Sequence, residues 1–193
     1  MNIKNYNFGE TQVTAIVNDG NYIWYSFLGV AGESILRKVS AYDITQVLYE
    51  LTLSVDKIVK LKISGSYLYV IVEDDTILLY RYTKVNPLTS PSTVNIPVGI
   101  NEYPIDLTLI GTDLFILFPG SLSGENAKIV KYNSSLVFQV TIDMNEVGKV
   151  SNDAKAIVTD ATNLWIITYE SPAKLIKVYG SGFSWNYNYW TIL

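Results

Sequence analysis

The chain has 193 residues, of which 49% are hydrophobic and 17% charged, and its formal net charge is −4. It contains no histidine and no cysteine, which excludes imidazole- and thiolate-based catalysis, thiolate metal sites and disulfides. The negative charge argues against duplex nucleic acid as a main partner, because that binding depends on Lys and Arg neutralising phosphates.

The apolar segments are short, and none approaches the roughly 18 to 20 residues that span a bilayer. The first ten residues lack the basic start and continuous apolar run of a secretory signal. We therefore expect a soluble chain without membrane insertion, and the compartment stays open.

Four segments of similar design follow one another along the chain. Each has a short apolar strand, a polar turn, an aromatic-bearing strand, a variable loop, a strand with a basic residue, and an outer strand. We expect residues 1–12 to form a further strand that aids closure of the array. The four repeats are expected at residues 13–53, 58–98, 104–142 and 155–191.

The aligned aromatic residues of the second strands are separated by 45, 46 and 50 residues, the repeat length of a propeller blade. A residue needed once in every repeat is most simply a packing residue between neighbouring sheets. These aromatics are Trp24, Tyr69, Phe115 and Trp165. A second recurring element is a Lys or Arg 12 to 16 residues later, which we expect to face solvent while its stem covers apolar neighbours. These basic residues are Lys38, Arg81, Lys131 and Lys177.

Two repeated elements in fixed order predict an all-β fold, a four-bladed β-propeller with four antiparallel strands per blade, in one domain over residues 1–193. The alternative is a half-propeller that dimerises into eight blades. The segment DATNLWIITY at 160–169 resembles the propeller repeats of the NHL, YVTN and two-component-regulator type. That resemblance implies the fold and leaves the activity open.

Acidic residues gather in the loops that the propeller plan places on one face. A field of one sign there attracts a cation or a basic partner, and the simpler interpretation is that these loops keep the rim soluble. The acidic residues considered for partner binding are Glu33, Glu73, Asp74, Asp75, Glu125 and Glu170. For the densest pair, Asp74-Asp75, a hairpin turn is favoured over a Ca²⁺ or Mg²⁺ site.

The carboxyl-terminal strand differs from the repeats because it is rich in aromatic residues that do not recur elsewhere. Tyr and Trp are enriched in protein interfaces, and outer-strand packing is the equal alternative. The residues concerned are Trp185, Tyr187, Tyr189 and Trp190.

These patterns predict a non-enzymatic protein-interaction or assembly module that binds a protein partner or itself. Lys outnumbers Arg 12 to 2, a bias that AT-rich coding sequence produces, which suggests a phage, an archaeal virus or an AT-rich microbe as the source. A virus or phage structural or host-interaction protein is therefore one of the roles considered. No catalytic, cofactor-binding or metal-binding residue is assigned and no cofactor is expected, although an axial ion held by backbone carbonyls stays open. The rival hypothesis is a carboxylate-based carbohydrate-binding or carbohydrate-active propeller, which requires several of Asp56, Asp74, Glu102 and Asp153 to converge.

Overall fold

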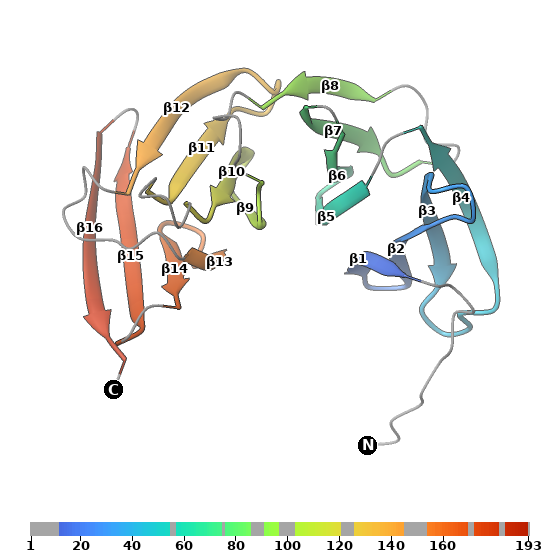
Figure 1. The fold of residues 1–193 in the computed structure, drawn as a ribbon, viewed down its shortest axis with the longest axis horizontal. Coiled ribbons are helices and arrows are strands. Elements are labelled where there is room, and N and C mark those ends of the chain that lie inside the picture. The colour runs from blue at the N-terminus through green and yellow to red at the C-terminus, as the bar shows by residue number, and fades with distance from the viewer. Residues whose placement is uncertain are drawn as a thin grey trace. The chain divides into compact units, whose positions relative to one another are not determined.

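The computed structural model describes residues 12–54, 57–74, 76–85, 91–96, 103–120, 126–144, 154–169, 172–181 and 184–192. These residues form sixteen β-strands arranged as four separate four-stranded sheets, whose strands are labelled in Figure 1. The part of the chain that is described contains no helix with the length and hydropathy of a membrane span. The prediction of an all-β chain built from four antiparallel four-stranded units is confirmed.

The first two sheets lie in the compact unit Met1–Ile96. The strands of the first sheet are β1 (Val13–Asp19), β2 (Tyr22–Leu28), β3 (Ser34–Ser40) and β4 (Val47–Leu53). The strands of the second sheet are β5 (Lys57–Ser64), β6 (Tyr67–Glu73), β7 (Ile77–Thr83) and β8 (Ser92–Asn95).

The third and fourth sheets lie in the unit Pro97–Leu193. The strands of the third sheet are β9 (Asp106–Ile110), β10 (Asp113–Phe118), β11 (Lys128–Tyr132) and β12 (Phe138–Asp143). The strands of the fourth sheet are β13 (Ala154–Thr159), β14 (Leu164–Thr168), β15 (Lys174–Ser181) and β16 (Ser184–Thr191).

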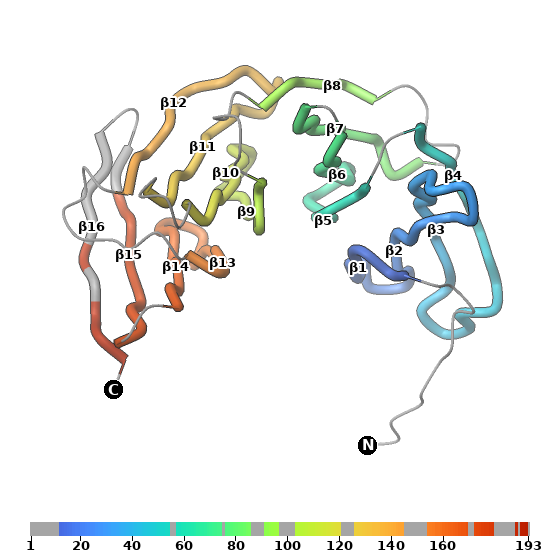
Figure 2. Tube along the Cα trace, viewed as in Figure 1, coloured from blue at the N-terminus to red at the C-terminus, as the bar shows by residue number. Residues whose placement is uncertain are grey.

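Consecutive strands pair antiparallel within every sheet, so the tube in Figure 2 runs from β1 to β16 as four successive meanders. The turns between the first and second strands carry the residues that such hairpins require. Gly20, Gly65 and Gly111 have φ values of 65°, 54° and 60°, a region that glycine adopts without a Cβ clash. The alternating side-chain period of the strands then gives each sheet two distinct faces.

We call the face that carries the aligned aromatic residue the aromatic face of a sheet, and the other its opposite face. In the first unit, Trp24 and Leu36 on the aromatic face of the first sheet pack against Leu61 and Val70 on the opposite face of the second. In the second unit the aromatic face of the third sheet packs in the same way against the opposite face of the fourth. Apolar burial between adjacent sheets thus supplies the core of each unit.

Hydrogen bonds also tie the two sheets of each unit together. The buried Ser34 Oγ on β3 accepts the backbone N–H of Ile58 on β5 at 3.1 Å. In the second unit, Asp106 Oδ2 on β9 accepts the N–H of Ile157 on β13 at 3.0 Å. Both bonds satisfy backbone donors at the sheet contacts.

Candidate functional site

The aligned aromatic and basic residues of every sheet are cross-strand partners. Opposite positions of antiparallel strands bring side chains on one face close together, so each basic group lies near its aromatic ring. The pairs are Trp24 with Lys38, Tyr69 with Arg81, Phe115 with Lys131, and Trp165 with Lys177. The Lys Nζ atoms lie 5.1, 5.6 and 5.5 Å from the ring centroids of Trp24, Phe115 and Trp165, within cation–π range.

Three of the aligned aromatic residues are buried, with exposed fractions of 1% for Trp24, 3% for Tyr69 and 1% for Phe115. Trp165 is only partly buried, and it stacks on Trp190 with ring centroids 5.7 Å apart. Trp190 itself is 47% exposed. The aromatic face of the fourth sheet is therefore open where the corresponding faces of the first and third sheets are packed.

Residues at matching positions make the difference between these faces clear. Ile167 follows Trp165 by two residues and is 41% exposed, whereas Leu117, at the same position of the third sheet, is fully buried. Trp190 corresponds to Ile142, which is 6% exposed. Val158 on β13, opposite Trp165, is 58% exposed. We call Val158, Trp165, Ile167 and Trp190 the open aromatic face.

The opposite face of the first sheet is open only in part and shows the converse difference there, whereas Tyr25, Phe27 and Val39 on the same face are buried. Ile16 on β1 is 58% exposed, whereas Leu61 and Ile157, at the same position of the second and fourth sheets, are each 2% exposed. Val13 and Val47 on this face are 45% and 49% exposed. We call Val13, Ile16 and Val47 the open aliphatic face.

Asp160 fixes the indole of Trp165 from the β13–β14 turn. Its Oδ2 accepts the Trp165 Nε1–H at 2.9 Å, and its Oδ1 accepts the backbone N–H groups of Thr162 and Asn163 at 3.0 and 2.8 Å. The Asn163 side chain donates to both carboxylate oxygens. These hydrogen bonds, those from Asn163 above all, hold the pKa of Asp160 well below its ordinary range.

Among the described residues, the acidic side chains considered for partner binding do not lie together in one cluster. Glu33 folds back on its own loop, where its Oε2 accepts the Ala31 N–H at 3.0 Å. Glu73 ends β6, and the adjacent Asp74 donates its backbone N–H to the Thr76 carbonyl at 3.2 Å. Within the described ranges no group of three or more acidic residues is placed to hold a metal ion. The other acidic candidates, Asp75, Glu125 and Glu170, lie outside the described residues.

The carboxyl-terminal aromatic residues lie on β16. Of these, the side chain of Trp190 is described, whereas those of Trp185, Tyr187 and Tyr189 lie outside the description. Asp56, Glu102 and Asp153, which the carbohydrate hypothesis considers, also lie outside it.

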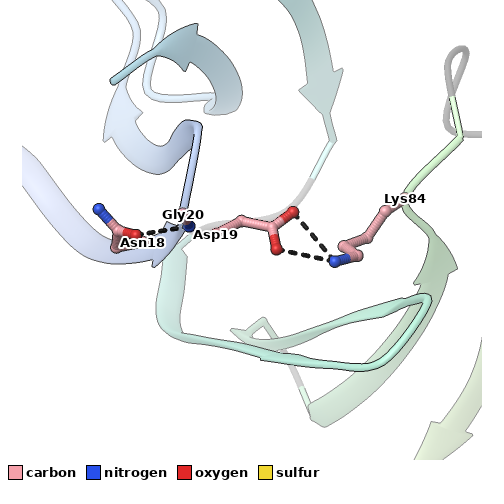
Figure 3. A network of polar contacts seen from close by, with 4 residues as sticks. All are labelled: Asn18, Asp19, Gly20 and Lys84. Carbon is pink, nitrogen blue, oxygen red and sulfur yellow. Dashed lines mark hydrogen bonds and ion pairs between the residues drawn. The ribbon is translucent and has the colours of Figure 1, made fainter. Parts of the chain in front are cut away.

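A pocket of about 470 Å³ lies within the first unit, between the β1–β2 and β5–β6 turns and the end of β7. Lys84 Nζ lies 2.8 and 3.0 Å from the two carboxylate oxygens of Asp19 there, which joins the first and second sheets (Figure 3). The same figure shows Asn18 Oδ1 accepting the Gly20 N–H at 2.7 Å, which stabilises the turn that presents Asp19. Lys38 also lines the pocket, with its Nζ 4.0 Å from the centroid of the Tyr22 ring.

Comparisons with known proteins support the fold. No protein-family model matches the chain, and no curated protein matches its sequence. Its structure is similar to the computationally designed Ika4 protein, at 9% identity and a TM-score of 0.57 over 94% of this chain and 92% of that one. It is also similar to the Myceliophteria thermophila Cps50 (Swd1) β-propeller domain, at 13% identity and a TM-score of 0.60. That match covers 94% of this chain and about half, 54%, of the other.

The chain therefore has a β-propeller type of repeat fold, built from four-stranded antiparallel sheets. The resemblance to NHL, YVTN or two-component-regulator repeats stays a prediction, as does the single domain over residues 1–193.

Proposed function

We propose that the chain is a non-enzymatic assembly module whose interaction surface is the open aromatic face of the fourth sheet. The observation that supports this most is the 41% exposure of Ile167 and 47% exposure of Trp190, at positions that are buried in the third sheet. Stacked Trp residues on an exposed apolar surface are typical of protein-binding hot spots. The absence of His and Cys supports the non-enzymatic assignment.

The partner we propose is the open aliphatic face of a second copy of this chain. Inside both units an aromatic face packs against the opposite face of the next sheet, so the chain carries its own template for this contact. Ile16 occupies the position at which Leu61 and Ile157 receive such a face.

We propose that the assembly is a pair of chains. One contact of this kind leaves an open aromatic face on one chain and an open aliphatic face on the other. A closed ring of copies covers every such face and a pair is its smallest form, whereas an open row of copies leaves one of each exposed at its ends. A pair of this kind corresponds to the eight-bladed alternative, and a role in a virus or phage particle stays a prediction from composition.

Light scattering coupled to size-exclusion chromatography tests this assembly. The wild type is expected at twice the 21.6 kDa chain mass. Trp190→Ser and Ile16→Asp are each expected to shift it to the monomer, because they act on the two sides of one contact. Tyr42→Ser, which removes an aromatic residue that is 81% exposed and belongs to neither face, is the matched control and should leave the mass unchanged. A monomeric wild type at high micromolar concentration would refute the proposal.

A further inference from the structure

The pocket of the first unit carries an uncompensated positive charge. Two ammonium groups, Lys38 and Lys84, and one carboxylate, Asp19, line it. Lys84 is paired with Asp19, whereas Lys38 forms no ion pair within the described part of the chain and instead lies over the rings of Tyr22 and Trp24. Burial lowers the pKa of Lys38 and the Lys84 charge lowers it further, against the opposing effect of Asp19.

The lysine of the third sheet that corresponds to Lys38 has a carboxylate partner on its own sheet. Lys131 occupies the position of Lys38, and its Nζ lies 2.7 Å from Asp113 Oδ2. Asp113 begins β10 just as Tyr22 begins β2, so Tyr22 stands where the third sheet has its carboxylate. The same chain therefore supplies a carboxylate to one of these lysines and leaves an open pocket beside the other.

We propose that this pocket binds a carboxylate group attached to an apolar body, with the Lys38 ammonium donating to the carboxylate. One net positive charge matches a single negative charge, and a charge-assisted hydrogen bond is favoured at a partly buried ammonium. The Tyr22 ring and the Val85 side chain line the pocket and provide surface for the apolar body. The site is separate from the open aromatic face, since it lies in the other unit.

An amide ¹H–¹⁵N NMR titration with benzoate tests this site. Benzoate is expected to shift the Gly65, Ser66 and Lys84 signals, whose residues line the pocket, and neutral benzamide of nearly the same shape is expected to leave them in place. Lys38→Met should weaken benzoate binding by at least about tenfold, because it removes a hydrogen bond to a charged group. Lys62→Met removes the same charge from β5 at a residue that does not line the pocket, and should bind as the wild type does.

A second variant keeps Lys38 and supplies the missing carboxylate from the chain. Tyr22→Asp copies the arrangement of Asp113 and Lys131, and it should also abolish benzoate binding. The dipeptide N-acetyl-phenylalanyl-glutamic acid amide, with its glutamine analogue as control, tests a peptide source of the carboxylate. If the dipeptide binds more tightly than benzoate, the natural ligand is a protein side chain. If the dipeptide binds more weakly, the natural ligand is a small acid.

Three results would overturn the proposal. They are benzamide shifts equal to those of benzoate, unchanged benzoate affinity in Lys38→Met, and no shift with benzoate or the dipeptide up to about 50 mM, far above the millimolar Kd of a weak fragment.

Discussion

Trp165 and Lys177 lie directly opposite each other on β14 and β15, with the ammonium 5.5 Å from the ring centroid of the indole. Trp24 and Lys38 form the same pair on β2 and β3 at 5.1 Å. The local interaction is therefore repeated, whereas its surroundings differ, because Trp24 is 1% exposed and Trp165 lies on an open face. The consequences of changing the two tryptophans should differ accordingly.

Trp24→Ala is expected to lower the free energy of unfolding of the monomer by about 3–5 kcal/mol, the cost of truncating a buried aromatic residue. Trp165→Ala should cost less than about half as much, because its side chain is only partly buried. Urea unfolding checks both, with both substitutions made in an Ile16→Asp background so that association does not contribute. Equal losses would show that the face carrying Trp165 is covered within the monomer.

Ser34→Ala tests the hydrogen bond that joins the two sheets of the first unit. Removal of Ser34 Oγ leaves the N–H of the buried Ile58 without this acceptor, at a cost of about 1–3 kcal/mol in the free energy of unfolding. Ser92→Ala, at an exposed serine of β8, is the control and should stay within about 0.5 kcal/mol of the wild type. Equal effects of the two substitutions in urea unfolding would contradict the structural role of Ser34.

Tyr132→Phe tests a buried hydroxyl that has no hydrogen-bond partner among the described residues. Removal of an unsatisfied polar group is expected to be neutral or to raise the free energy of unfolding by up to about 1 kcal/mol near pH 7. A loss of more than that amount in urea unfolding would mean that the hydroxyl makes a stabilising interaction.

Tyr132 also predicts a dependence of stability on alkaline pH. Burial raises its pKa from 10.0 to about 12 in the folded chain. Between these two values the unfolded phenol has lost its proton and the folded one keeps it, so stability falls as pH rises. In urea unfolding at several pH values, the free energy of unfolding should fall less with rising pH for Tyr132→Phe than for the wild type. Equal falls of the free energy would contradict the prediction.

Asp160 should hold the Trp165 indole in place even in acid. Because its folded pKa is lowered, its stabilising contribution is complete above its ordinary pKa of 3.8 and is lost only as pH falls through the lower folded value. The Trp165 indole N–H signal in NMR is therefore expected to stay constant from pH 7 down to about 3. A transition centred near pH 4 would contradict this, and Asp160→Ala should shift the signal at every pH.

The sequence contained enough information to predict the repeats, since Trp24, Tyr69 and Phe115 recur at nearly constant spacing and are buried. The strand that ends the chain was also predictable from alternation, and β16 spans Ser184–Thr191. The pairing of Trp165 with Lys177 was present in the same spacings. Recognising it requires the register that places an aromatic residue and a basic residue opposite each other on adjacent strands.

Exposure of the fourth sheet was beyond sequence reasoning. Ile167 and Leu117 are both aliphatic residues two positions after an aligned aromatic, so residue type predicts burial for both. Their exposures, 41% and 0%, differ because of what covers each face, a tertiary property that no local pattern carries. That Lys38 has a tyrosine where Lys131 has the carboxylate of Asp113 likewise follows only from the register, which aligns Tyr22 with Asp113.

Site-specific crosslinking between two single-cysteine proteins tests the proposed assembly most directly, because the chain has no cysteine of its own. Ile16→Cys lies on β1 and Val158→Cys on β13, the first strands of the first and fourth sheets. The first strands of adjacent sheets touch within each unit, as β1 touches β5 and β9 touches β13. When the two proteins are mixed and treated with a short bis-maleimide, we predict a crosslinked pair containing one of each. Val158→Cys mixed with Thr141→Cys, at an exposed site of β12, is the control and should give no pair. Failure of the Ile16→Cys and Val158→Cys proteins to crosslink above this control would contradict the contact between the first and fourth sheets of two chains.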